Sequence, residues 1–210
     1  MTMRERINQG KLFTDMCEGL PEERAEAKRR MHLYNDVFMD TPDRRAEMLA
    51  NMLGQAEGIW IEPPFYFCYG THIFVGKGTY INFNCNFIDD GRITIGQDVL
   101  FGPAVTIATV GHPICPDMRE YMYTAPVIIE DNVWVGANVT ICPGVTIGKN
   151  SVIGAGSVVT KDISANTVAA GNPCQMIREI NERDRRFYFR DRPIDADDLA
   201  EEAALREGKG

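Results

Sequence analysis

The chain has 210 residues, of which 44% are hydrophobic and 25% charged, and its formal net charge is −8. This length fits one domain, or one domain with an appendage. The composition is that of an ordinary globular protein and excludes a disordered or fibrous chain. An acidic chain is a poor partner for a phosphate backbone, so we expect no nucleic-acid binding. No apolar run reaches the roughly 20 residues of a membrane-spanning helix, and the N-terminus lacks the apolar core of a signal peptide. We therefore expect a cytoplasmic protein with no membrane segment.

The first 60 residues predict a small helical cap. One helix is expected after Leu20, because Pro21 suits a first turn and the acidic side chains precede the basic ones, as the helix dipole favours. A second is expected from Thr41-Pro42-Asp43 onward. Its apolar stripe consists of Met48, Leu49, Met52 and Leu53.

From about residue 61 the pattern changes to a repeat of six. Its most regular part places an aliphatic residue at every sixth position, at Ile129, Val135, Ile141, Ile147, Ile153 and Val159. Four positions after each aliphatic residue comes a small or β-branched one, at Val133, Val139, Val145, Ser151 and Ser157. A period of six fits neither an amphipathic helix nor a simple strand.

Such a period fits a chain that turns a corner every six residues. One aliphatic side chain per face then points inward, and Asn132, Asn138 and Asn150 occupy corners where positive φ is expected. Three faces make one triangular coil, and the coils stack through parallel hydrogen bonds. The sequence therefore predicts a mainly β protein, a hexapeptide-repeat parallel β-helix over residues 61–174.

The repeat is interrupted once and ends once. The interval from Ile107 to Ile129 is not a multiple of six, which predicts an extruded loop over residues 109–125. Beyond residue 174 the repeat is lost. We expect residues 175–210 to form a charged helix, up to about Arg190, followed by a polar tail.

The loop carries Gly111-His112-Pro113, and His112 is the first candidate for catalysis. A general base needs one ring nitrogen free to accept a proton and a partner for the other. Glu120, a carboxylate from another coil, or a backbone carbonyl would each serve as that partner. The alternative is a surface histidine without a role. His72 is expected to be a structural residue, and His32 is expected to lie on the face of a helix.

Two further features have both a functional and a structural interpretation. Asn82, Asn84 and Asn86 alternate along the sequence, which predicts that they share one outward face and could hold a polyol. The alternative is an asparagine ladder at β-helix corners. Lys161 near the end of the repeat could receive a phosphorylated cofactor, or the segment around it could simply cap the repeat. The six cysteines are single, with no CxxC pair and no zinc spacing. We therefore expect reduced thiols and no metal site.

Together, these motifs resemble those of the hexapeptide-repeat sugar O-acetyltransferases. The resemblance rests on the six-residue repeat, the Gly111-His112-Pro113 loop and the segment Ala169-Ala170-Gly171-Asn172-Pro173-Cys174 with Ile177-Arg178-Glu179-Ile180 beyond it. Within this family, residues 10–21 are similar to the galactoside O-acetyltransferases, with the maltose O-acetyltransferases as close relatives. The resemblance to the family covers all but about the last 18 residues of the chain.

The resemblance implies a left-handed parallel β-helix that assembles as a homotrimer with active sites between subunits. It implies acetyl transfer from acetyl-CoA to a sugar hydroxyl, the 6-hydroxyl of a galactoside, without metal or acyl-enzyme. His112 matches the family's catalytic histidine. Matches to the acceptor side are Asp15, Arg24, Cys68, Asn82 and Asp90; matches to CoA-contacting positions are Asn82, Ala137, Ala155, Thr160, Lys161 and Arg178.

Three departures from the family pattern bear on specificity. Cys68 stands where galactoside enzymes usually have Ser, which exchanges a hydroxyl for a weaker hydrogen-bonding thiol. Gln175 stands where a second CoA-contacting Arg is expected, which removes one phosphate partner. The loop after His112 is about two residues shorter than the galactoside pattern, so Tyr121 and Met122 would reshape the acceptor side.

Alternatives to a galactoside O-acetyltransferase remain. The nearest is a maltose or glucose O-acetyltransferase. From other classes, a β-helical carbonic anhydrase would need a three-histidine zinc site, which a chain with only 3 His supplies poorly. A non-catalytic β-helical scaffold would show no thiol release from acetyl-CoA.

Overall fold

The structure, a computed structural model, describes residues 1–36, 42–197, 199–200 and 203. It divides into two compact units, Met1–Arg178 and Glu179–Gly210, and each is considered by itself. The first unit holds the N-terminal helices, the repeat and the protruding loop, so all the expected site residues lie within it.

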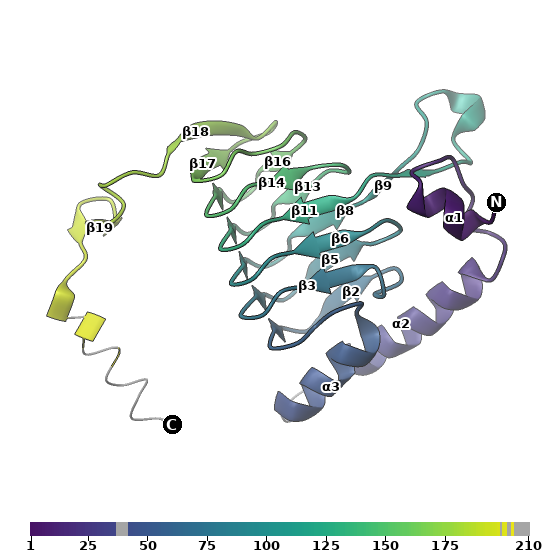
Figure 1. The fold of residues 1–210 in the computed structure, drawn as a ribbon, viewed down its shortest axis with the longest axis horizontal. Helices are drawn as coiled ribbons and strands as arrows, with labels where there is room; N and C mark the ends of the chain where they lie inside the picture. Colours follow the sequence, from purple (N-terminus) through teal and green to yellow (C-terminus); the bar gives the residue numbers. More distant parts are fainter. Residues whose placement is uncertain (37–41, 198, 201–202, 204–210) are drawn as a thin grey trace. The chain divides into compact units, whose positions relative to one another are not determined.

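The N-terminal segment is helical, as expected. It contains α1 (Met3–Asn8), α2 (Leu20–Asp36) and α3 (Pro42–Met52). Thr2 and Glu5 form a capping box at the start of α1, because each side chain accepts a hydrogen bond from the backbone of the other. Thr41, expected to begin the second helix, lies outside the described residues. Figure 1 shows α2 and α3 across the end of the β-helix where its first coil begins.

The repeat forms a parallel β-helix with three faces (Figure 1). Face 1 consists of β1 (Trp60–Ile61), β4 (Tyr80–Ile81), β7 (Leu100–Phe101), β12 (Trp134–Val135), β15 (Val152–Ile153), β17 (Thr167–Ala170) and β18 (Gln175–Glu179). Face 2 consists of β2 (Phe65–Phe67), β5 (Cys85–Ile88), β8 (Thr106–Ala108), β13 (Thr140–Ile141) and β16 (Val158–Val159). Face 3 consists of β3 (Ile73–Val75), β6 (Ile93–Ile95), β11 (Val127–Ile129) and β14 (Thr146–Ile147).

Successive coils stack in register, and this register builds the core. Ile129 pairs with Ile95 on one side and with Ile147 on the other. All six aliphatic residues of the regular repeat are at most 1% exposed, which confirms the inward-facing period of six. Full burial of such a side chain contributes roughly 1.5–3 kcal/mol, so the aliphatic stack dominates the stability of the coil.

The backbone turns sharply at the corners, and asparagine occupies several corner positions with a positive φ. Asn132, Asn138 and Asn150 have φ of 56°, 55° and 61°, as the sequence predicted. Along the corner between faces 3 and 1, the Asn132 amide donates to Asn150 Oδ1 at 3.0 Å, and the Asn150 amide donates to Asn166 Oδ1 at 2.8 Å. The side chains therefore form a ladder that repeats the spacing of the coils.

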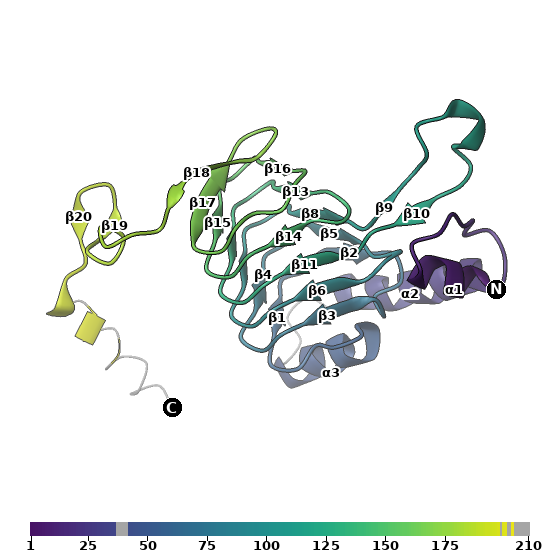
Figure 2. The ribbon, with the colours of Figure 1, turned by 45° about the horizontal axis from the view of Figure 1, so that its top comes forward.

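The extruded loop is present at the corner between faces 2 and 3. It leaves through β9 (Val110–Gly111), passes through a 3-10 turn (Pro116–Met118) and returns through the antiparallel β10 (Tyr123–Thr124). Figure 2 shows this hairpin leading away from the coils beside α1. Phe13 and Met122 form an isolated antiparallel bridge, so the N-terminal segment holds the loop.

The helix expected over residues 175–190 is not formed, and this expectation is corrected. The segment from Gln175 to Glu179 is strand β18, which pairs with β17 on face 1. Two short antiparallel strands follow, β19 (Phe187–Phe189) and β20 (Arg192–Pro193). The last coil offers an open hydrogen-bonding edge, and pairing with that edge overrides the helical propensity of the segment. Helical backbone occurs only from Ala196, in the described part of the tail.

Two further observations concern the cysteines and the helices. All six cysteines are free thiols, and Cys85 and Cys174 are buried. In the part of the chain that the structure describes, no helix combines the length and apolar character needed to cross a membrane.

The asparagine ladder generates a stability prediction. Asn150→Ala should destabilise the fold by about 1–2 kcal/mol, because it removes two hydrogen bonds and places a side chain that disfavours positive φ at a left-handed corner. Asn150→Gly, the matched control, keeps the corner conformation and loses only the ladder. In urea unfolding, the free energy of unfolding should be highest for the wild type, lower for Asn150→Gly and lowest for Asn150→Ala. Equal stability of the two variants would contradict the role of φ.

Candidate active site

His112 lies near the base of the loop, and its ring is oriented by the loop itself. Its Nδ1 lies 2.8 Å from the Arg119 carbonyl oxygen and 3.0 Å from the Tyr121 carbonyl oxygen. Carbonyl oxygens only accept hydrogen bonds, so Nδ1 carries the proton and Nε2 keeps its lone pair. The ring is exposed, so this lone pair is available to a ligand. Of the three partners that the sequence left open, a backbone carbonyl is the one found.

Gly111, the residue before His112, lets the Tyr123 side chain of the opposite strand pack against the hairpin backbone. A Cβ at this position would lie 2.6 Å from the Tyr123 hydroxyl oxygen, so a larger residue would require the Tyr123 side chain to move.

A second group of candidate residues gathers at the same corner, in the two coils before the loop. Asp90 follows β5 and is only 5% exposed, and Cys68 in the turn after β2 is half-buried. The neighbouring Asp89 is fully buried and accepts hydrogen bonds from the Cys68, Tyr69 and Gly70 backbone amides. The acidic pair and the turn thus form one compact unit, which we call the acidic corner (residues 68–70 and 89–90).

Arg24 of α2 brings a positive charge to the acidic corner. It forms an ion pair with Asp15, and its guanidinium donates a hydrogen bond to the Tyr69 hydroxyl at 3.4 Å. Burial acts to lower the pKa of Arg24, but the Tyr69 hydroxyl, Asp15 and Asp90 outweigh it and raise the pKa above its ordinary value. The structure therefore brings together four of the five expected acceptor-side residues, namely Asp15, Arg24, Cys68 and Asp90.

Burial changes the ionisation of this corner. It raises the pKa of Asp90 to about 6, with Asp89 and Asp15 adding repulsion and Arg24 acting in the opposite direction. It also raises the pKa of the Cys68 thiol to about 12, together with the two neighbouring carboxylates. At neutral pH Asp90 is therefore mostly ionised, and Cys68 is a neutral thiol that can donate a weak hydrogen bond but is no nucleophile.

Asn82, the fifth expected acceptor-side residue, lies at a different corner, between faces 1 and 2. Its side-chain oxygen accepts from the Phe83 amide at 2.9 Å, and Asn84 next to it has a φ of 61°. The chain turns here, so Asn82 and Asn84 lie at the corner and Asn86 lies on face 2. The expectation that the three share one outward face is therefore wrong, because a corner separates them.

The expected CoA-contacting residues are spread along the later coils. Ala137 and Ala155 occupy the same corner as Asn82 in successive coils, and a Cβ at Gly102 or Gly136 would lie 2.6 Å from the Ala137 or Ala155 nitrogen. Thr160 and Lys161 are exposed after β16, and Arg178 is exposed in β18. The small residues at this corner therefore let consecutive coils approach each other closely.

One chain therefore does not bring His112 and Asn82 together. The corner of Asn82 and the corner of the loop are joined by the strands of face 2, of which β5 is four residues long. Four residues of strand span about 13 Å. A substrate that contacts both side chains would need them from different subunits.

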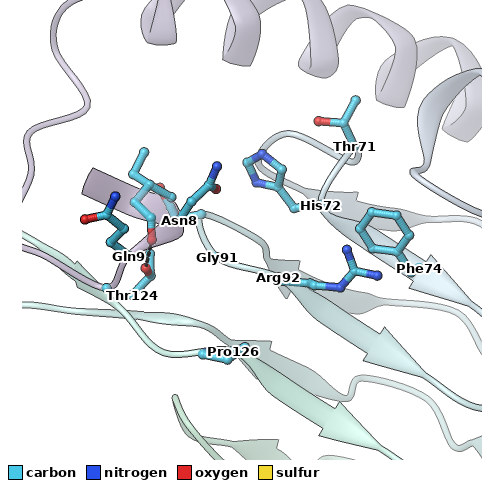
Figure 3. Close-up of a pocket in the computed structure, with 12 residues that line it drawn as sticks. Asn8, Gln9, Thr71, His72, Phe74, Gly91, Arg92, Thr124 and Pro126 are labelled. Carbon is cyan, nitrogen blue, oxygen red and sulfur yellow. Dashed lines mark hydrogen bonds between the residues drawn. The ribbon is translucent and has the colours of Figure 1, made fainter. Parts of the chain in front are cut away.

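A groove of about 590 Å³ lies beside α1 rather than at His112. The sequence does not predict this groove, although Asp90 is one of its lining residues. Figure 3 shows Asn8 and Gln9 on one side of it and His72, Phe74 and Arg92 on the other. The Arg92 guanidinium lies 3.6 Å from the centre of the Phe74 ring. No repeat or motif in the sequence signalled this groove, because it forms between α1 and face 3.

The histidines do not form a metal site. Both ring nitrogens of His72 are engaged, Nδ1 with the Asp89 carbonyl oxygen and Nε2 with the Arg4 guanidinium. His32 is exposed on α2. Among the described residues, no three His, Cys, Asp or Glu side chains are grouped so that they could hold a metal ion. A three-histidine zinc site of the carbonic anhydrase kind therefore finds no support in the geometry.

Comparison with known proteins identifies two matching family models and a similar relative. Residues 126–161 match the hexapeptide repeat of succinyl-transferase, and residues 6–58 match the maltose acetyltransferase hexapeptide capping motif. The galactoside O-acetyltransferase of Escherichia coli K12 is 50% identical over 199 residues, which cover 93% of this chain and 98% of that protein.

Two solved structures are similar over most of their length. A galactoside acetyltransferase in complex with coenzyme A superposes with a TM-score of 0.87 at 46% identity, covering 93% of this chain and 100% of that one. A maltose O-acetyltransferase from Clostridium difficile 630 has a TM-score of 0.84 at 43% identity, covering 87% and 99%. The chain belongs to the hexapeptide-repeat sugar O-acetyltransferase family, and it is an enzyme of that class.

The acidic corner generates a prediction on pH and stability. The folded-state pKa of Asp90 is raised from 3.8 to about 6, so its charged form destabilises the fold above that pH. Asp90→Asn should therefore stabilise the protein by roughly 1–3 kcal/mol at pH 8. The gain should shrink steadily as the pH falls from 7 towards 4, where Asp90 is neutral in the folded state. Urea unfolding across this range measures it.

The matched control is Glu57→Gln, which neutralises an exposed carboxylate. It should leave the stability difference near zero at every pH. A destabilised Asp90→Asn protein at pH 8, or a gain that does not depend on pH, would contradict the burial argument.

Proposed function

We propose that the protein transfers the acetyl group of acetyl-CoA to a hydroxyl of a sugar, with the 6-hydroxyl of a galactoside as the first candidate. The observation that carries this proposal is the orientation of His112. Two backbone carbonyls fix the proton on Nδ1, so Nε2 is a ready acceptor for a hydroxyl proton.

The reaction we propose is a direct transfer. The sugar hydroxyl oxygen attacks the thioester carbonyl carbon while its proton moves to His112 Nε2. The C–S bond then breaks, and the imidazolium returns the proton to the departing thiolate of CoA. During the reaction, the two carbonyl oxygens that accept from Nδ1 stabilise the imidazolium. No acyl-enzyme forms, which agrees with the neutral state of the Cys68 thiol.

The acidic corner is proposed to bind the acceptor. Carboxylates accept hydrogen bonds from sugar hydroxyls, and the guanidinium of Arg24 donates to hydroxyl oxygens. Asp15, Arg24, Cys68 and Asp90 form this side, and Asn82 is proposed to contact both substrates from another subunit. The donor side is proposed to consist of Asn82, Ala137, Ala155, Thr160, Lys161 and Arg178.

A homotrimer is the assembly that we propose. Face 1 carries an outward ladder of apolar side chains in register, from Trp60 and Tyr80 through Leu100 to Trp134. Leu100 is 51% exposed and Trp134 is 56% exposed in the single chain. An exposed apolar ladder of this kind favours contact with another subunit.

Each part of the chain then has a distinct proposed role. Residues 1–60 supply Asp15 and Arg24 to the acceptor side, residues 61–174 form the rod with the proposed catalytic loop at 109–125, and Arg178 in β18 adds to the donor side. The cytoplasm, where thiols stay reduced, is the proposed location, and the six free thiols are consistent with it.

Maltose or glucose is the second candidate acceptor. The match of residues 6–58 to a maltose acetyltransferase capping motif supports it, because this segment supplies Asp15 and Arg24. Cys68, which replaces the serine usual in galactoside enzymes, and the shorter loop also act on the acceptor side. Gln175 affects the donor side instead, where it offers an amide in place of an arginine.

The base assignment predicts the effect of His112→Ala. Thiol release from acetyl-CoA should depend on an added sugar, and the variant should lose at least about 10²-fold in kcat, the usual contribution of a general base. Its KM for acetyl-CoA should change little. A panel of galactosides, maltose and glucose, assayed by thiol release, identifies the preferred acceptor.

The control for this experiment is Glu120→Gln. Glu120 lies on the same loop, but the backbone rather than its side chain orients His112, so this variant should stay within about twofold of wild type. Undiminished activity in His112→Ala would contradict the proposed mechanism. Absence of sugar-dependent thiol release from the wild type would favour a non-catalytic scaffold.

The shared site predicts subunit complementation. His112→Ala and Asn82→Ala should each be nearly inactive as pure proteins. After the two are unfolded together and refolded, about one quarter of the sites in random mixed trimers should hold both wild-type side chains, so activity should return to about that fraction. Refolding each variant alone is the control, and no recovery in the mixture would place both residues in one subunit.

A further inference from the structure

The acidic corner contains a carboxylate that takes no direct part in the proposed chemistry. Asp89 is 0% exposed, and this burial raises its pKa, while backbone amides of the 68–70 turn rather than solvent satisfy its oxygens. Its Oδ1 accepts from the Cys68 amide at 2.8 Å and from the Tyr69 amide at 2.9 Å, and its Oδ2 accepts from the Gly70 amide at 2.7 Å. Three consecutive backbone amides therefore converge on one side chain.

The turn held in this way carries the acceptor side. Cys68 lies in the turn, the Tyr69 hydroxyl accepts from Arg24, and Asp90 follows Asp89 directly in the chain. Gly70 closes the turn with a φ of 76°, and a Cβ there would lie 2.4 Å from the Met52 carbonyl oxygen. The position of each of these groups thus depends on the contacts of Asp89.

Asp89 is also connected to the N-terminal helices. Its backbone carbonyl oxygen lies 2.6 Å from His72 Nδ1, and His72 Nε2 lies 2.9 Å from the Arg4 guanidinium. An arginine only donates, so Nε2 is the acceptor and Nδ1 carries the proton of a neutral ring. Arg4 also pairs with Glu23 of α2 and lies 5.2 Å from the centre of the Tyr69 ring.

The use of a carboxyl group distinguishes this corner from the corner between faces 3 and 1. Thr79 braces that corner with its hydroxyl, which donates to the Gly96 carbonyl at 2.9 Å and accepts from the Val99 amide at 3.1 Å. Among the buried polar residues in the described part of the chain, Asp89 and Asp90 are the two with an ionisable side chain, and burial raises the pKa of both. Burying an ionisable group costs more than burying a hydroxyl, so corner geometry alone does not explain Asp89.

We propose that Asp89 is a positioning residue for the acceptor, which holds the 68–70 turn so that Cys68, Arg24 and Asp90 meet one sugar, and that His72 and Arg4 fix this turn to the helical cap. The inference rests on the proposed acetyl transfer. It adds that acceptor affinity is set by a buried carboxylate that does not touch the sugar.

The experiment compares Asp89→Asn with the wild type and with Thr79→Val as matched control, well below the melting temperature of each. In Asp89→Asn the amides of residues 68–70 should exchange hydrogen at least about 10-fold faster, while exchange in the other coils stays unchanged. The KM for the preferred sugar should rise at least about 10-fold, with kcat at saturating sugar and KM for acetyl-CoA within about twofold. Thr79→Val should lower the melting temperature and leave both KM values unchanged.

His72→Ala tests the same turn without disturbing a fully buried group, should Asp89→Asn fail to fold. It should raise the sugar KM by about 3- to 10-fold and speed exchange at residues 68–70, again without an effect on the acetyl-CoA KM. Unchanged exchange at 68–70, or equal changes in both KM values, would overturn the positioning role. A wild type that transfers acetyl to no sugar would instead overturn the proposed function, and hydrogen exchange would then still decide whether Asp89 holds the turn.

Discussion

Parallel hydrogen bonding between consecutive coils is the constraint on which the rest of this molecule depends. Each strand has two to five residues and is too short to be stable alone, and it persists because a strand of the next coil pairs with it. The register aligns one aliphatic side chain per face, such as Ile95, Ile129 and Ile147 on face 3. The stacked side chains fill the interior, so no space remains inside the rod for a substrate.

Chemistry is therefore confined to the corners and to the segments that leave them. The corner between faces 2 and 3 carries the acidic corner and, further along the rod, the loop with His112. The corner between faces 1 and 2 carries Asn82 and a row of small residues. Because the coils stack in register, these groups keep fixed spacings along the rod, and the proposed use of His112 together with Asn82 calls for a second copy of the chain.

The repeat could be predicted from the sequence because its cause is local. A period of six, corner asparagines and an interval that breaks the period identified the β-helix and the loop around His112. The contacts that orient the site could not be predicted. The partners of His112 are carbonyl groups, which every residue has, and the role of Asp89 depends on three amides that lie about 20 residues away in sequence. The prediction of a helix from Gln175 is wrong because Gln175–Glu179 pairs with the open strand edge of the last coil, which is a tertiary feature.

The orientation of His112 by the carbonyls of its own loop has an evolutionary consequence. His112 and both carbonyls belong to one hairpin, so the orientation of its ring does not depend on any side chain of the rod. Exchanges of residues between His112 and Arg119 leave the rod and the two carbonyl contacts in place. Under the proposed transfer, acceptor preference can therefore diverge through changes at the tip of a single hairpin, without new mutations in the core to compensate for them.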